Sequence, residues 1–142
     1  MTVAAILERK GPAVVTVDSE APVKEAVRLL AEHRIGTVVV LGEDGVAGIL
    51  SERDLVYCLA KEGAAALELP VSRVMTAPVI TIEPSVSVLA ALSSMSKRRI
   101  RHLPVVEGGK LAGLVSIGDL VAWRIAKIEE EAEAMRAYIQ GA

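Results

Sequence analysis

The segment GILSERD, residues 48–54, recurs as GLVSIGD, residues 113–119. Each copy has a glycine and two apolar residues, followed by a serine and an aspartate three residues apart. The pattern predicts a strand end followed by the first turn of a helix. Such a turn offers free backbone N–H groups and a positive dipole end to an anion, and the aspartate can accept hydrogen bonds from sugar hydroxyls. We therefore expect paired nucleotide pockets.

The two copies belong to a longer tandem duplication. An offset of 65 aligns residues 14–60 with residues 79–125 without a gap. A unit of about 60 residues buries only about 60% of its unfolded surface and is marginal alone, so we expect the halves to pack on each other. The expected organisation is a first repeat at residues 1–65, a second repeat at residues 66–127 and a C-terminal helical extension at residues 128–142.

Hydrophobic periodicity predicts the same order of elements in both halves: strand, helix, strand, strand, helix. A short helix over residues 2–9 precedes the first half, and residues 71–76 are expected to repeat its role as one helical turn. Helices are predicted over residues 22–34, 52–62, 88–99 and from 117 onward. Strands are predicted over residues 14–17, 37–41, 46–50, 79–82, 102–106 and 110–115.

Composition limits the classes of function. The chain is 52% hydrophobic with no Phe, one Trp and two Tyr, and its net charge is −2, so neither nucleic acid nor an anionic membrane is strongly attracted. The single cysteine, Cys58, cannot form an internal disulfide, which fits a reducing compartment. The apolar run at residues 1–7 is short and precedes its charges, so we expect no signal peptide, no membrane span and a cytoplasmic location.

The last predicted helix carries a heptad pattern. Its apolar residues step alternately by four and three positions, with glutamates at 129, 130, 131 and 133 outside the stripe. Two interpretations remain open: the helix lies back on its own domain, or it mediates self-association. The residues of the stripe are Val121, Ile125, Ile128, Ala132, Met135 and Ile139.

A purely structural explanation competes for the repeated motif. Ser and Asp three residues apart form a capping box, in which each side chain bonds a backbone N–H of the same turn. That explanation does not account for Gly48 and Gly113, because strand interiors avoid glycine unless something approaches the backbone closely. From the residues alone, a cap and a ligand site remain equally supported.

The whole chain resembles a cystathionine-beta-synthase-type (CBS) domain pair, the Bateman module, in its freestanding form. The resemblance covers about residues 2–127. Its motifs are Val15–Val17, Val23–Ala26, Arg34–Gly36, Gly48–Asp54, Val74–Thr76, Arg99–Val106 and Gly113–Asp119.

This resemblance implies an α+β fold of two βαββα repeats related by a pseudo-twofold axis. It also implies clefts for adenosine derivatives: AMP, ADP or ATP, with NAD or S-adenosylmethionine as further candidates. Asp54 and Asp119 would hold ribose hydroxyls, with Ser51 and Ser116 near the phosphate. The first cleft would comprise Ser51, Arg53, Asp54, Thr81, Arg101, His102 and Pro104. The second would comprise Ser116, Asp119, Thr16, Gly36 and Thr37.

The two expected clefts differ in charge. Arg101 and His102 replace Gly36 and Thr37, and they follow a cationic run at residues 97–99. Lys97 and Arg98 are explained by the preference of cations for the C-terminal end of a helix. Arg101 and His102 instead lie where the family places phosphate contacts. The Asp54 cleft is therefore expected to be the better phosphate binder, and occupancy of the second cleft is left open.

No catalytic or metal-binding pattern is found. The two histidines, His33 and His102, are too few for a metal site, and no nucleophile–base set can be assembled. The preferred hypothesis is a non-catalytic, homodimeric adenine-nucleotide sensor that regulates an unknown protein. The alternative is a ligand-free interaction module that dimerises or recruits a partner through its C-terminal helix. Nucleic-acid binding through residues 97–102 is the weakest hypothesis, because the chain is acidic and nearly free of aromatic residues.

Overall fold

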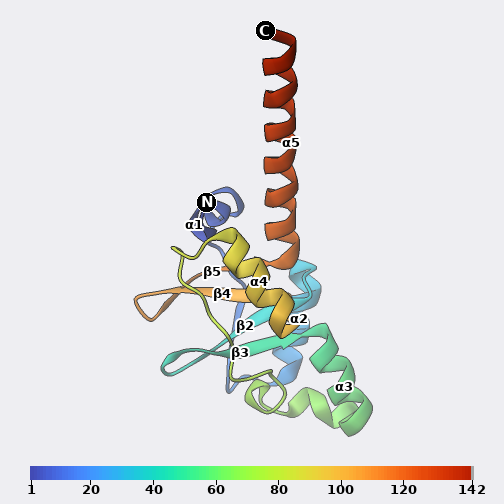
Figure 1. Cartoon of the computed structure of the whole chain (residues 1–142). Helices are drawn as coiled ribbons and strands as arrows, with labels where there is room; N and C mark the ends of the chain where they lie inside the picture. Colours follow the sequence, from blue (N-terminus) through green and yellow to red (C-terminus); the bar gives the residue numbers. More distant parts are fainter. Residues whose placement is uncertain (142) are drawn as a thin grey trace.

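The computed structural model describes residues 1–141 as two similar halves and a long C-terminal helix (Figure 1). Each half contributes a β-hairpin with a helix before it and a helix after it. The elements are α1 (Val3–Lys10), β1 (Thr16–Asp18), α2 (Val23–His33), β2 (Thr37–Gly42), β3 (Gly45–Ser51), α3 (Glu52–Glu62), the 3₁₀ helices η1 (Gly63–Glu68) and η2 (Val71–Arg73), α4 (Val88–Arg98), β4 (His102–Glu107), β5 (Lys110–Ser116) and α5 (Ile117–Gly141).

The two hairpins have matching registers. In the first half, β1 pairs in parallel with β2, and β2 pairs antiparallel with β3, so that Thr37 lies opposite Ser51. In the second half, β4 and β5 form an antiparallel pair, with His102 opposite Ser116. Both hairpins also have a register irregularity at equivalent positions near their turns. The duplication seen in the sequence is therefore retained in the backbone pairing.

The strand expected at residues 79–82 is not formed as a strand. Only Ile82 makes a parallel bridge, to Val105. In the first half, the N–H of Val39 donates to the carbonyl of Val15 over 3.2 Å. The residue equivalent to Val39 is Pro104, which has no N–H to donate, so the second half loses this ladder bond.

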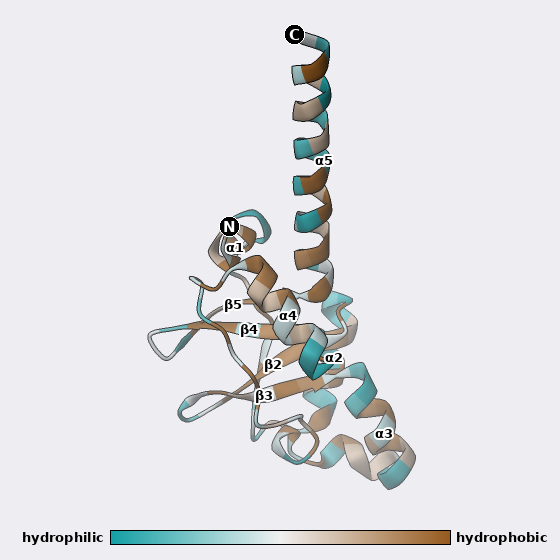
Figure 2. Cartoon of the chain, viewed as in Figure 1, coloured by the Kyte–Doolittle hydropathy of each residue, from teal (hydrophilic) through white to brown (hydrophobic). Residues whose placement is uncertain are grey.

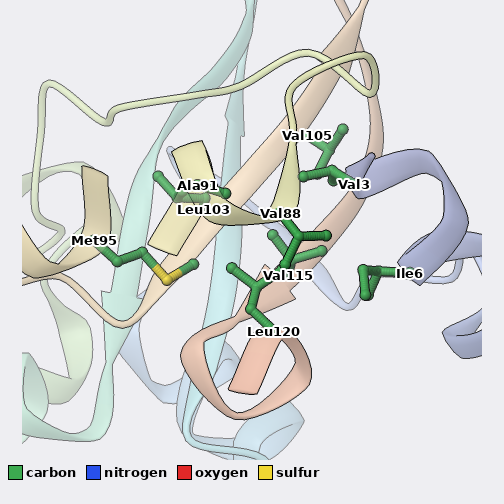
Figure 3. Close-up of a cluster of buried hydrophobic side chains, with 9 residues drawn as sticks. All are labelled: Val3, Ile6, Val88, Ala91, Met95, Leu103, Val105, Val115 and Leu120. Carbon is green, nitrogen blue, oxygen red and sulfur yellow. The ribbon is translucent and has the colours of Figure 1, made fainter. Parts of the chain in front are cut away.

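The short helical segment that precedes each half packs on the hydrophobic core of the other half. In Figure 3, Val3 and Ile6 of α1 lie with Val88 and Leu120, which belong to the second half. Val71, the first residue of η2, packs in the core of the first half. The apolar face of α1, which is part of the predicted first repeat, therefore packs in the core of the second repeat. The two hydrophobic cores do not divide at the predicted boundary, residue 65. The linker expected at residues 64–70 is largely the 3₁₀ helix η1.

Helix α5 begins against the second half and then extends away from it (Figure 1). Leu120 is fully buried, and Trp123 packs against the same hydrophobic cluster. The predicted extension at residues 128–142 continues this helix, and its last residue, Ala142, lies outside the described residues. Within residues 1–141, no helix combines the length and apolar character needed to span a membrane.

Candidate nucleotide cleft

Both repeated Ser–Asp pairs are capping boxes. The N–H of Asp54 donates to Ser51 Oγ over 3.3 Å, and the N–H of Ser51 donates to Asp54 Oδ2 over 3.0 Å. The same two bonds join Asp119 and Ser116, at 3.1 and 2.8 Å. Each helix start is thus stabilised by its own side chains, typically by about 1 kcal/mol. The cap alone explains a hydroxyl and an acid at this spacing.

The repeated glycines make room for neighbouring chain segments. A Cβ atom on Gly48 would lie 2.7 Å from Met75 Sδ and 2.7 Å from the carbonyl oxygen of Thr76. A Cβ atom on Gly113 would lie 2.6 Å from Leu7 Cδ2. Both distances are too short for a real side chain. Protein atoms therefore occupy the space next to both glycines, and the glycines are not evidence for a ligand site.

A cleft of about 370 Å³ opens beside Asp54. Its first wall is the β3–α3 corner together with the start of β2. Its second wall is the extended chain at residues 78–80 together with residues 99–102, before and at the start of β4. The cleft is thus shared by both halves, and its size falls in the range of about 300–1,000 Å³ typical of small-molecule sites.

Most residues predicted for the first site meet in this cleft. Ser51, Arg53, Asp54, Arg101 and His102 line it, whereas the other two predicted residues, at 81 and 104, do not. Residues 36 and 37, which were predicted for the second site, line this cleft as well. They do so because β2 and β4 begin side by side, with Thr37 Oγ1 only 3.5 Å from His102 Nδ1.

Sequence reasoning did not include Thr76 in the site. Its hydroxyl donates to Asp54 Oδ1 over 3.1 Å, and its backbone pairs with Ile49 of β3. Thr76 belongs to the motif Val74–Thr76 that carried part of the family resemblance, and that was the only signal for its role. The Asp54 carboxylate therefore accepts hydrogen bonds from the N–H and the hydroxyl of Ser51 and from the hydroxyl of Thr76.

The cleft contains more cationic than anionic side chains. Arg53, Arg99 and Arg101 line it, against the carboxylates of Glu52 and Asp54. Among the described residues, none of the three arginines takes part in an ion pair. Arginines without a partner carboxylate are suited to bind phosphate groups, because their planar N–H donors match phosphate oxygens.

His102 contributes a neutral ring to this cleft. Burial lowers the pKa of His102 below its ordinary value, Lys10 and Arg101 lower it further by their charges, and Asp119 opposes them in part. The ordinary pKa of a histidine is about 6.5, so the ring is uncharged at neutral pH. His102 can then donate one hydrogen bond and accept another, while the positive charge of the cleft comes from arginine.

The second carboxylate has a different environment. Lys10 Nζ of α1 lies 2.7 Å from Asp119 Oδ2 and donates to the carbonyl of Leu114 over 2.8 Å. Burial acts to raise the pKa of Asp119, but the hydrogen bonds from Lys10 and from the N–H of Ser116 outweigh it and hold the pKa below its ordinary value. Asp119 is thus ionised and already paired.

The space beside Asp119 does not gather the other residues predicted for the second site. It has a volume of about 300 Å³ and lies between α1 and α5. Thr16 is on β1, and Gly36 and Thr37 line the Asp54 cleft instead. The lining residues are Ile6, Arg9, Lys10, Asp119, Ala122, Trp123 and Ala126.

A family model for the CBS domain matches the chain twice, at residues 6–61 and 71–126. This chain belongs to the CBS domain family. The two matches confirm the predicted tandem repeat. The CBS-domain protein ATU1752 from Agrobacterium tumefaciens has 44% sequence identity and a TM-score of 0.80, over 87% of this chain and 92% of that one. The predicted α+β fold of paired CBS repeats is confirmed.

Two similar CBS proteins have been solved with adenosine compounds. PAE2072 from Pyrobaculum aerophilum, complexed with AMP, is 27% identical with a TM-score of 0.74, over 84% of this chain and 89% of that one. The CBS domain pair of MJ0100, in complex with 5′-methylthioadenosine and S-adenosyl-L-methionine, is 26% identical with a TM-score of 0.77, over 89% and 98%. The chain spans about 60% of the length of the first curated relatives that it matches.

Proposed function

We propose that this CBS domain pair is a cytoplasmic, homodimeric sensor that binds an adenine nucleotide in the Asp54 cleft and has no catalytic activity. The observation that carries the proposal is the cleft itself. It joins a carboxylate from one repeat with Arg101 from the other, in a space large enough for a small molecule. The adenosine ligands of PAE2072 and of the MJ0100 domain pair support the ligand class.

The roles within the cleft follow from the chemistry of its side chains. The Asp54 carboxylate accepts hydrogen bonds from the ribose hydroxyls, after the Thr76 hydroxyl turns aside. Arg53 and Arg101 hold the phosphate. The apolar residues Val79, Ile80 and Ile100 line the cleft and provide a surface for the adenine ring. AMP, ADP, ATP, NAD and S-adenosylmethionine all carry the adenosine part of this arrangement.

Regulation requires that the ligand distinguish two states of the protein, because a ligand with equal affinity for both shifts nothing. The cleft lies between the repeats, so a bound nucleotide contacts both halves and favours one spacing between them. We propose that this change alters the affinity for a regulated protein.

Isothermal titration with AMP, ADP, ATP, NAD and S-adenosylmethionine tests the proposal. Asp54→Ala removes charge-assisted hydrogen bonds and should weaken binding by about 1.5–3 kcal/mol, which is roughly ten- to more than a hundredfold. Ser87→Ala is the control, because it removes a helix cap that lies outside both predicted sites. Unchanged affinity in Asp54→Ala would remove the site assignment.

A second candidate function is a ligand-free interaction module. It is favoured by the capping boxes, which already use both carboxylates. In that case none of the five compounds produces a binding isotherm, and Asp54→Ala lowers thermal stability without any nucleotide effect. The second nucleotide site predicted at Ser116, Asp119, Thr16, Gly36 and Thr37 stays a prediction, and its ligand would have to displace Lys10 from Asp119.

A further inference from the structure

Helix α5 exposes a continuous apolar stripe. Its residues step alternately by four and three positions, and the large side chains among them are between 41% and 67% exposed. Apolar residues follow the helix well beyond the body of the protein (Figure 2). The stripe consists of Val121, Ile125, Ile128, Ala132, Met135 and Ile139.

The body of the protein contacts the other side of this helix. Leu120 is fully buried, Trp123 packs against the core of the second half, and Trp123 and Ala126 line the space next to α1. The stripe begins with Val121 and Ile125, on the side of α5 opposite to these contacts. Their side chains are 41% and 52% exposed even in the first turns of the helix. The stripe is thus directed away from its own domain along its whole length.

We propose that α5 pairs with α5 of a second copy as a parallel, in-register, two-stranded coiled coil. The alternating steps assign heptad position a to residues 125, 132 and 139 and position d to residues 121, 128 and 135. The d positions hold Val121, Ile128 and Met135, so the layer residues alone do not select two strands. The flanking e and g positions from residue 124 to residue 136 are all charged, so the apolar seam is narrow and fits two strands. Burying the stripe removes from water the largest run of apolar residues on the helix.

The flanking charges select the parallel orientation. Position g holds Arg124 and Glu131, and position e holds Glu129 and Arg136. In a parallel coil, each g residue faces the e residue five positions later on the second helix. Arg124 then faces a glutamate and Glu131 faces an arginine, and symmetry produces each attractive pair twice.

An antiparallel pairing with the same apolar layers gives the opposite result. It is centred near residue 130, so Glu129 faces Glu129 of the second copy and Glu131 faces Glu131. Like charges in such positions disfavour association. Within the described residues, none of the four flanking charged side chains is in an ion pair of its own chain. They are free to pair across the coil.

This inference specifies the homodimer named in the proposed function. It rests on α5 and not on the Asp54 cleft, so nucleotide binding and coil formation can fail separately. Nucleotide titration tests the first, and measurements of mass test the second.

Light scattering during gel filtration tests the assembly of the full chain. We expect a mass of twice 15.0 kDa. Ile128→Asp places a charge in the stripe and should give a monomer with an unchanged circular dichroism spectrum, because Ile128 is 48% exposed in the single chain. Ala134→Asp adds the same charge at heptad position c, outside the stripe, and should remain dimeric. A monomeric wild type, a trimer, or a dimer insensitive to Ile128→Asp overturns the proposal.

Cross-linking and charge reversal test the orientation. In a Cys58→Ser background, Met135→Cys should form a disulfide-linked dimer on mild oxidation, because residue 135 meets itself only in the parallel coil. Glu129→Arg should weaken the dimer by about tenfold, and adding Arg124→Glu should restore it. A dimer without the cross-link, or a Glu129→Arg dimer of unchanged affinity, would mean that the helices are not parallel and in register.

Discussion

Thr37 Oγ1 and His102 Nδ1 lie 3.5 Å apart, although 65 residues separate them in the chain. The two residues occupy equivalent positions at the starts of β2 and β4. Their contact shows that the pseudo-twofold relation between the repeats passes between these strands. Equivalent residues of the two repeats lie next to each other at this point. A difference between them therefore makes the Asp54 cleft and the Asp119 cleft unequal. Arg101, next to His102, has Gly36 as its counterpart.

Arg101 provides the first prediction. Arg101→Gln should weaken binding of AMP by roughly tenfold or more and leave binding of adenosine almost unchanged, because its charge is expected to contact phosphate. Isothermal titration with both compounds measures this difference. Lys97→Gln is the control, since Lys97 is an exposed cation at the end of α4 outside the cleft. Equal losses for AMP and adenosine would show that Arg101 does not act on the phosphate.

His102 should make stability depend on pH. Its pKa is lowered in the folded state, first by burial, so the unfolded chain takes up the proton first as the pH falls. The folded protein therefore loses stability from about pH 6.5 down to the folded pKa. His102→Gln removes this loss. The stability advantage of the wild type over the variant, from urea unfolding, should be smaller at pH 5.5 than at pH 7.5, and a constant difference would contradict the prediction.

Lys10 should stabilise the contact between α1 and α5 only while Asp119 is ionised. Lys10 and Asp119 are 36% and 27% exposed, so Lys10→Met should cost at most about 1 kcal/mol of unfolding free energy at pH 7. The pKa of Asp119 is lowered in the folded state, so this contribution is present above about pH 4 and is lost as the pH falls through the folded pKa. Urea unfolding of the wild type and Lys10→Met at pH 7 and pH 3 measures this loss of unfolding free energy, which should be smaller at pH 3.

Two controls accompany Lys10→Met. Lys24→Met breaks the pair with Glu68, whose side chains are 58% and 70% exposed, and should have almost no effect. Lys10→Met should also raise the pKa of His102, since Lys10 helps to lower it. A proton NMR titration in a His33→Gln background follows His102 alone. A His102 pKa unaffected by Lys10→Met would argue against the electrostatic link between them.

Gly48 should tolerate alanine less well than Gly113. A Cβ on Gly48 meets the backbone oxygen of Thr76 at 2.7 Å, whereas on Gly113 the close atoms belong to the Leu7 side chain, which can rotate. Gly48→Ala should cost about 1–3 kcal/mol, and Gly113→Ala less. Gly118→Ala is the control, because its nearest atom is 3.6 Å away and alanine favours a helix. Thermal unfolding ranks the three variants, and equal costs for Gly48→Ala and Gly113→Ala would contradict this reasoning.

Residue patterns predicted the helices and both hairpins because local periodicity decides which face of each element is apolar. The same patterns wrongly predicted a strand at residues 79–82. Pro104, which is distant in sequence, lacks the N–H that would have hydrogen-bonded to this segment. The patterns also gave no indication that the close neighbours of Gly48 are Met75 and Thr76. A pattern shows that a position needs space, and only the packed chain shows which atoms occupy it.

The sequence by itself determined that this protein is a duplication, that each half carries a Ser–Asp helix start, and that the last helix has an apolar stripe. These are local properties, repeated at a constant offset. Tertiary structure alone decided that Lys10 pairs with Asp119 while Asp54 borders an open cleft. The physical reason is that α1 packs on the second repeat and brings the cation of Lys10 to Asp119. The chain after η2 instead brings the uncharged Thr76 to Asp54.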